Sequence, residues 1–210
     1  MKKFSLITLL VLLIDQSLKI YVKSHFEIGE SVPIFSWFQL FFVENPGMAY
    51  GLHLGSGYLG KILLSSFRLV LSIGILYWIF RHLKKGASSY FIIPMSLIFS
   101  GAIGNLIDSA FYGLIFDTGM VFWEQLDRWV NYAGVSRFHS PGYSFFMGGC
   151  VVDMLSFPLI DDYFPEWIPY FGGKHFEFFK PIFNIADTAI SLGVSFLFLF
   201  PNRAFAHENI

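Results

Sequence analysis

The amino-acid sequence predicts an α-helical integral membrane protein with four transmembrane helices, a small extracytoplasmic β-sheet and an extended outer loop. Composition is the first observation behind this prediction. Of the 210 residues, 55% are hydrophobic and only 14% are charged, whereas charged residues make up about 25% of ordinary soluble domains. The second observation is that four stretches approach the roughly 20 apolar residues that a spanning helix requires. The third is the position of the basic residues, which predicts the orientation of these spans.

The four expected spans belong to one membrane domain that covers residues 1–210. They lie at about 4–22, 60–80, 90–108 and 182–200. The first span follows two lysines, as the apolar region of a signal peptide does, but its apolar run continues through Asp15 and Lys19 without a small-residue cleavage site. We therefore expect the first span to be retained as a helix.

Basic residues predict that both termini are cytoplasmic. The densest cluster is "RHLKK" (Arg81–Lys85), between the second and third spans, while Lys2 and Lys3 precede the first span and Arg203 follows the fourth. Segments rich in lysine and arginine stay on the cytoplasmic side. The two long loops, about 24–59 and 109–181, are then expected outside.

The two outer loops differ in pattern. The first contains aromatic and β-branched residues that lead into the Asn-Pro-Gly turn at Asn45, which favours a short sheet on the membrane surface. The second is rich in glycine, proline and aromatic residues, with Trp123, Trp129 and Trp167 suited to the membrane interface.

Several classes of function are disfavoured. A net charge of -1 without a long basic run disfavours nucleic acid as a partner. The single cysteine, Cys150, excludes an internal disulfide, and the six histidines lack metal-ligand spacing, so we expect no metal and no cofactor. Cys150 with His139 or His175 is a weaker candidate for nucleophile and base than for ordinary packing.

Four aspartates lie inside apolar runs, where an unpaired charge is expensive. "NLID" ends the expected third span with Asn105 and Asp108, and "NIAD" begins the fourth with Asn184 and Asp187. Because these spans run in opposite directions, both pairs fall near the same outer boundary. Two further carboxylates are expected near that level, namely Asp153 in "CVVDMLSFP" and Asp15, four residues before Lys19.

Each aspartate also has a simpler explanation, except one. Asp15 and Lys19 are suited to a helix-surface ion pair, and Asp187 to a helix N-cap. Asp108, at a helix C-terminus, needs a partner and is better suited to orienting than to chemistry. Asp153 has no such explanation. Two carboxylates in a poorly hydrated place share a proton, as in aspartic proteases, but spacing alone leaves all four aspartates in contention.

Five short boxes in the sequence resemble those of the lipoprotein signal peptidases (signal peptidase II). In chain order they are DQSLKIYV (Asp15–Val22), ENPGMAY (Glu44–Tyr50), GAIGNLIDS (Gly101–Ser109), VVDM (Val151–Met154) and FNIADTAI (Phe183–Ile190). Any single box would be a weak signal, but five in order make a specific match. The resemblance implies an aspartic endopeptidase of the bacterial cytoplasmic (inner) membrane that cuts signal peptides before a diacylglyceryl-modified cysteine.

The resemblance also implies the site and its partners. The family's catalytic pair falls on Asp153 and Asp187. Its supporting residues fall on Asp15, Lys19, Asn45, Gly47, Asn105, Asp108, Asn184 and Ala186. The implied partners are lipid-modified prolipoproteins, membrane phospholipid and cyclic peptide antibiotics of the globomycin type, with the active site near the outer face.

Two departures from the family pattern stand out. Ser109 occupies the place where the family usually has an arginine, and Arg128 or Arg137 in the outer loop are candidates to replace that charge. The stretch 109–149 is longer than usual, which suggests a lid or binding surface. The competing hypotheses are a small proton-coupled transporter that uses intramembrane carboxylates and a non-catalytic membrane scaffold.

Overall fold

A computed structural model describes residues 1–47, 57–178 and 180–206 of the protein. Three helical segments in this part are long and apolar enough to cross a membrane: α1 (Lys2–His25), α2 (Gly57–Lys84) and Ser89–Ile115. The third segment comprises α3 (Ser89–Ile107), the π-helical turn η1 (Asp108–Tyr112) and α4 (Gly113–Ile115). Three expected spans are thus confirmed as apolar helices, although the third continues past Asp108.

The fourth expected span is a shorter apolar helix. It consists of α5 (Ile185–Leu199), which has 15 residues, followed by α6 (Pro201–Ala204). A helix rises 1.5 Å per residue, so α5 is about 22 Å long, less than the roughly 30 Å hydrocarbon core of a bilayer.

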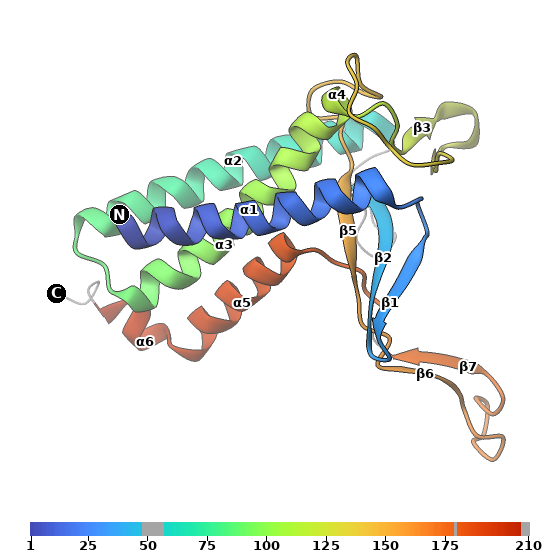
Figure 1. Cartoon of the computed structure of the whole chain (residues 1–210). Coiled ribbons are helices and arrows are strands. Elements are labelled where there is room, and N and C mark those ends of the chain that lie inside the picture. Colours follow the sequence, from blue (N-terminus) through green and yellow to red (C-terminus); the bar gives the residue numbers. More distant parts are fainter. Residues whose placement is uncertain (48–56, 179, 207–210) are drawn as a thin grey trace.

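The helices form a bundle in which α3 packs against α1, α2 and α5 (Figure 1). Glycines make the close approach possible. A Cβ at Gly104 would lie 2.7 Å from Asp15 Oδ2 and 3.0 Å from the Cβ of Ala186, and one at Gly101 would collide with the carbonyl oxygen of Ala186. Glycine in the "GAIGNLID" box therefore brings α1 and α5 onto α3 at the level of the polar residues.

The polarity of the bundle is inverted relative to a soluble protein. On α1, Leu9 and Leu13 are 59% and 56% exposed, whereas Asp15 and Lys19 have no exposed surface. Large apolar side chains also cover the outside of α2, including Phe67 and Val70. An apolar exterior around buried charges is the arrangement expected for helices surrounded by lipid.

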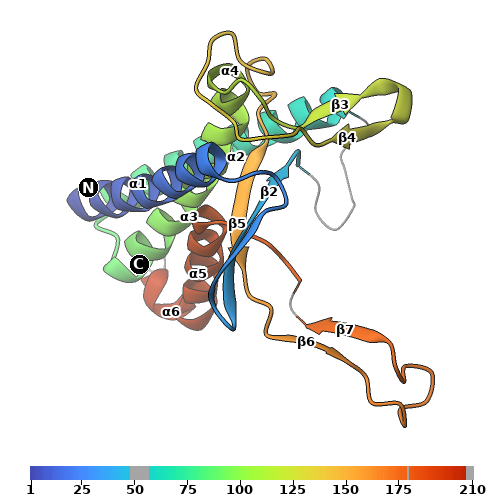
Figure 2. The same ribbon diagram turned by 45° about the vertical axis from the view of Figure 1, so that its right-hand side comes forward.

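A three-stranded antiparallel sheet stands across one end of the bundle (Figures 1 and 2). Its strands are β1 (Ser31–Phe35), β2 (Phe38–Asn45) and β5 (Val151–Ser156), in the order β1-β2-β5. The N terminus, the α2–α3 turn and α6 lie at the opposite end (Figure 1). The sheet joins the helices through an apolar cluster of Val22, Phe26, Phe42, Tyr112, Phe116, Val152, Met154 and Leu155.

The expected outer loop 109–181 is folded for much of its length. One hairpin, β3 (Val121–Trp123) with β4 (Arg128–Val130), contains the short 3-10 turn η2 (Glu124–Leu126). A second hairpin, β6 (Ile160–Tyr163) with β7 (His175–Phe178), projects from the far end of the sheet (Figure 2).

The segment 109–149, called the insert below, is anchored by a buried ion pair between Lys23 of α1 and Glu44 of β2. Lys23 Nζ also donates to the carbonyl oxygen of Thr118 at 3.0 Å, and Glu44 accepts from the backbone N–H of Met120 at 2.8 Å and from the Tyr132 hydroxyl at 3.1 Å. These contacts tie the middle of the insert to both α1 and β2.

Candidate functional site

The candidate residues from five chain segments meet where the helix bundle joins the sheet. They are Asp15 and Lys19 from α1, Asn45 at the end of β2 and Gly47 just after it, Asn105 from α3, Asp108 from η1, Asp153 from β5, the N-cap Asn184 of α5, and Ala186 and Asp187 in the first turn of α5. Gly47 takes part through its backbone N–H, which donates to Asn45 Oδ1 at 2.8 Å. Residues 48–50 of the same sequence box lie outside the described residues.

The start of α5 is shaped by a reciprocal capping box. Asn184 is the N-cap, and its Oδ1 accepts from the backbone N–H of Asp187 at 2.9 Å. Asp187 Oδ2 in turn accepts from the Asn184 N–H at 3.3 Å. From the sequence, Asp187 is a candidate for the N-cap of this helix, but the N-cap is Asn184. Asp187 occupies the third helical position, where the helix dipole favours an anion.

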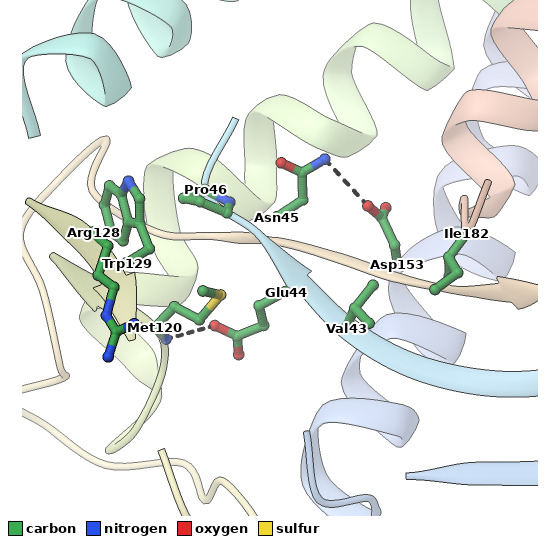
Figure 3. A pocket seen from close by; sticks show the side chains of 9 residues that line it. All are labelled: Val43, Glu44, Asn45, Pro46, Met120, Arg128, Trp129, Asp153 and Ile182. Carbon is green, nitrogen blue, oxygen red and sulfur yellow. Dashed lines mark hydrogen bonds between the residues drawn. The ribbon is translucent and has the colours of Figure 1, made fainter. Parts of the chain in front are cut away.

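Asp153 lies on β5 with a nearly fully buried side chain, 4% exposed. In the β2–β5 register it is opposite Val43, so it shares one face of the sheet with Asn45, two residues further along β2. Asn45 Nδ2 donates to Asp153 Oδ2 at 3.4 Å (Figure 3), and Asn184 Nδ2 donates to Oδ1 at 2.6 Å. Both carboxylate oxygens are thus held by amides.

Two asparagines connect Asp153 with Asp187. Asn105 Nδ2 donates to Asp187 Oδ1 at 2.8 Å, and Asn105 Oδ1 accepts from Asn184 Nδ2 at 3.1 Å. Since Asn184 also binds Asp153, the two carboxylates are the ends of one chain of amide contacts. Side-chain amides can hold carboxylates in place without neutralising their charge.

The other two aspartates, Asp15 and Asp108, form ion pairs with the same lysine, Lys19. Lys19 Nζ lies 3.0 Å from Asp15 Oδ2 and 2.8 Å from Asp108 Oδ2, and all three side chains have no exposed surface. Asp15 Oδ1 also accepts the N–H of Ala186 at 2.9 Å, and Asp108 accepts from Gln16 Nε2 at 2.9 Å. The expected α1 ion pair therefore extends to Asp108, which supplies the partner that Asp108 was predicted to need.

The environment of Asp153 favours its protonated form. Burial raises the pKa of Asp153 to about 7, and the negative charge of Asp187 adds to this, while Lys19 and the hydrogen bonds from Asn184 and Asn45 oppose it. This carboxyl therefore keeps its proton to a higher pH than an ordinary aspartate does. A buried carboxyl of this kind beside a second carboxylate has the properties of an acid and base pair.

A cavity of about 460 Å³ opens beside Asp153 (Figure 3). Its lining comprises Val43, Glu44, Asn45, Pro46, Met120, Arg128, Trp129, Asp153 and Ile182. The β3–β4 hairpin of the insert contributes Arg128 and Trp129, so the insert forms one wall of the candidate site. A largely apolar cavity whose two buried carboxyls are Glu44, paired with Lys23, and Asp153 is suited to an apolar peptide or lipid segment.

No cluster of three or more histidine, cysteine, aspartate or glutamate side chains within residues 1–47, 57–178 and 180–206 is arranged to hold a metal ion. The carboxylates that do gather here are already bonded to lysine and asparagine side chains.

Sequence reasoning did not single out Gln16 or Arg68 for this site. Gln16 binds Asp108 and accepts from the Tyr112 hydroxyl at 3.1 Å, and Arg68 Nη1 of α2 donates to Ser109 Oγ at 3.2 Å. Arg68 could have been found from the sequence, because it belongs to a polar face on an otherwise apolar helix. The residues of this face, at helical spacing, are Lys61, Ser65, Arg68 and Ser72.

For Arg128 and Arg137, the two candidates to replace the charge at Ser109, the structure gives other positions. Arg128 is exposed in the cavity wall, and Arg137 is exposed with its backbone N–H donating to Asp117 at 2.7 Å. The arginine that contacts Ser109 is Arg68.

A family model and individual relatives both match this chain over most of its length. The model of the family described as signal peptidase (SPase) II matches residues 7–201. A lipoprotein signal peptidase of Porphyromonas gingivalis is 42% identical over 197 residues, which cover 93% of this chain and 81% of the relative. One of Amoebophilus asiaticus is 34% identical over 201 residues, which cover 94% and 76%.

Solved structures support the fold. Two bacterial membrane enzyme structures, at 2.3 and 1.9 Å resolution, each match with a TM-score of 0.57 and 22% and 23% sequence identity. Each match covers 95% of this chain. It covers 87% of the chain solved at 2.3 Å and 92% of the chain solved at 1.9 Å.

Proposed function

Because the chain belongs to the signal peptidase II family, the lipoprotein signal peptidases, we propose that it cleaves prolipoproteins with a catalytic pair formed by Asp153 and Asp187. Removal of signal peptides from prolipoproteins is the activity of this family, and the transporter hypothesis has no support from the comparisons. One observation supports this choice of pair. Lys19 forms ion pairs with Asp15 and Asp108, whereas Asp153 and Asp187 are connected to each other by side-chain amides.

The proposed reaction is a direct hydrolysis. Asp187, as carboxylate, takes a proton from a water molecule whose oxygen attacks the scissile carbonyl carbon, while protonated Asp153 donates its proton to the carbonyl oxygen. The tetrahedral diol then collapses: the carbonyl re-forms, the C–N bond breaks, and the leaving nitrogen receives a proton from Asp187. The diol returns a proton to Asp153, which restores the starting state of the pair.

The amide contacts have a clear task in this reaction. Asn105 holds Asp187 Oδ1 at 2.8 Å, and Asn184 holds Asp153 Oδ1 at 2.6 Å. The second oxygen of each carboxyl accepts a longer hydrogen bond, 3.4 Å from Asn45 Nδ2 to Asp153 and 3.3 Å from the Asn184 N–H to Asp187, and is the one proposed to exchange protons. Fixed orientation of the reacting groups reduces the entropy that must be lost in the transition state.

The arrangement of helices and sheet supports a site at the outer membrane boundary. In this proposal residues 1–210 form one domain, α5 is the fourth span, both termini and the "RHLKK" turn are cytoplasmic, and the sheet lies on the outer surface. The lipid-modified segment of the substrate then reaches Asp153 through the apolar cavity, beside membrane phospholipid. The same cavity would bind a cyclic peptide of the globomycin type in competition with the substrate.

The peptidase proposal is tested by incubating the purified protein with a diacylglyceryl-modified prolipoprotein and determining the new N terminus. We expect cleavage immediately before the lipidated cysteine. Cys150→Ser should keep the rate within about twofold, because the thiol is only 1% exposed and burial raises its pKa to about 12. A rate loss in this variant, together with an acyl-enzyme trapped by hydroxylamine, would show nucleophilic catalysis instead of direct hydrolysis.

The proposed orientation predicts the outcome of cysteine labelling in cells, with Cys150→Ser as background. Lys84→Cys, at the exposed end of α2, should react only after the cytoplasmic membrane is permeabilised. Gln125→Cys, exposed in the β3–β4 hairpin, should react with an impermeant reagent supplied from outside. The reverse pattern would place the carboxylate pair on the cytoplasmic side, where exported substrates are not available.

A further inference from the structure

One face of α2 carries polar side chains into the protein, although the helix is otherwise apolar. This face consists of Lys61, Ser65, Arg68 and Ser72, spaced four, three and four residues apart. Ser65 Oγ donates to the carbonyl oxygen of Met147 at 3.2 Å, and Ser72 Oγ donates to that of Arg68 at 2.7 Å. Arg68 itself is only partly exposed, whereas its neighbour Phe67 is 59% exposed on the outside of the helix.

Arg68 is linked to Asp187 by three successive hydrogen bonds, through Ser109 and Asn105. Its Nη1 donates to Ser109 Oγ at 3.2 Å, and the Ser109 hydroxyl donates to the carbonyl oxygen of Asn105 at 3.0 Å. The side chain of Asn105 holds Asp187. Ser109, which has no exposed surface, thus connects the guanidinium with the residue that orients Asp187.

Two buried or half-buried cations, Lys19 and Arg68, act on the pair. The guanidinium of Arg68 interacts electrostatically with Asp187, Asp108 and Asp153, in decreasing order. Lys19 is bonded to Asp15 and Asp108, so it is engaged by two carboxylates already. Among the described residues, the cations that act on the pair are Lys19 from α1 and Arg68 from α2, and Arg128 from β4 lines the same cavity as Asp153. Glu44 is paired with Lys23, and Lys61 interacts with Asp108 and Glu44.

We propose that Arg68 is a positioning residue for the catalytic pair: held by Ser109, it adds from α2 a second positive charge, beside that of Lys19, that keeps the pair singly protonated at neutral pH. This inference rests on the proposed function, because it assigns a role relative to Asp153 and Asp187. A fixed cation that acts on a carboxylate pair favours the state in which one member is ionised. The base is then available at the pH at which the enzyme works.

The test is the pH dependence of kcat/KM for cleavage of a lipidated prolipoprotein. Removing the cation makes the pair harder to deprotonate, so Arg68→Gln should move the acidic limb of the profile to higher pH by about one unit. At neutral pH, kcat should fall by roughly 10- to 100-fold while KM changes less than about threefold. Arg68→Lys keeps the charge and should leave the limb near its original position.

Two further variants separate charge from packing. Arg81→Gln removes an exposed arginine at the other end of α2 and should not move the limb. Arg68→Ala combined with Ser109→Arg moves the charge to the neighbouring segment and should restore the limb. If Arg68→Gln fails to fold, this double variant decides: a restored limb supports the proposal, and a shifted limb or an inactive folded protein overturns it.

The proposal is also overturned if folded Arg68→Gln keeps the original limb, or if Arg68→Lys behaves like Arg68→Gln, because Arg68 then only ties α2 to Ser109. Failure of the proposed function looks different. In that case Asp153→Asn or Asp187→Asn retains cleavage, whatever the profile of the Arg68 variants.

Discussion

Asp153→Asn and Asp187→Asn should each lower kcat for prolipoprotein cleavage by at least about 10³-fold, because an amide neither accepts nor donates the proton that the reaction transfers. The geometry should survive the change, since the hydrogen bonds from Asn184 to Asp153 and from Asn105 to Asp187 end on oxygens that an asparagine also has. The measurement is turnover in detergent or lipid, with binding of the uncleaved substrate as the proof of a folded site.

Asp153→Asn should in addition stabilise the protein at alkaline pH. The pKa of Asp153 is about 7 in the folded protein against 3.8 for the unperturbed group. Between these values the folded state binds more protons than the unfolded state, so the free energy of unfolding falls as the pH rises through this window. Asparagine removes this loss, which amounts to about 4 kcal/mol or less. The variant should melt higher than the parent at pH 8 and the difference should disappear near pH 4.

Asp162→Asn is the matched control, because it changes an exposed carboxylate on the β6 strand in the same way. It should leave turnover and melting unchanged. Near-normal turnover of either active-site variant would remove that residue from the proposed pair. An inactive Asp153→Asn variant that melts no higher at pH 8 would show that Asp153 is not held in the poorly hydrated environment described above.

Lys19→Met should be the most destabilising single substitution among the supporting residues. The lysine binds Asp15 and Asp108, and all three side chains have no exposed surface. Removing one partner of a buried ion pair leaves uncompensated charge and costs about 3–5 kcal/mol. In a chain of this size the melting temperature should fall by roughly 10 °C. Activity should fall with it, since Asp15 also holds the start of α5 through the Ala186 N–H.

Two variants serve as comparisons for Lys19→Met. Lys84→Met replaces an exposed lysine and should change the melting temperature little. Lys19→Met combined with Asp108→Asn removes one of the two buried carboxylates that have lost their cation, and it should recover part of the lost stability. Asp108→Asn alone should lose stability or activity only in part. A melting shift of less than about 2 °C for Lys19→Met would contradict the buried network.

Much of the architecture could be predicted from the sequence because its signals are local. A span is recognised from the length of its apolar run, and Lys2–His25 and Gly57–Lys84 are helices where such runs occur. The aromatic and β-branched pattern before Asn45 likewise predicted strands, which are present as β1 and β2. The order of five short boxes was sufficient to predict the family, which the comparisons show.

Other features depend on which segments meet, and no local pattern reports that. The sequence predicted four aspartates near one boundary but not which of them act together. Asp108 is bound by Lys19, 89 positions away in the chain, whereas two asparagines bridge Asp153 and Asp187. The insert was expected as an extended outer loop, and its folded hairpin and anchor on Lys23 and Glu44 depend on the β2–β5 pairing and the end of α1.

The contact between Arg68 and Ser109 shows the same division between sequence and tertiary structure. The family resemblance of the sequence identified Ser109 as a departure from the usual arginine, and the spacing of Lys61, Ser65, Arg68 and Ser72 forms a polar helix face that sequence reasoning did not use. Only the packing of α2 against α3 decided that Arg68, and not Arg128 or Arg137, reaches Ser109. The physical reason is that periodicity determines which side chains share a helix face, whereas the partner of that face is chosen by close contacts between distant segments.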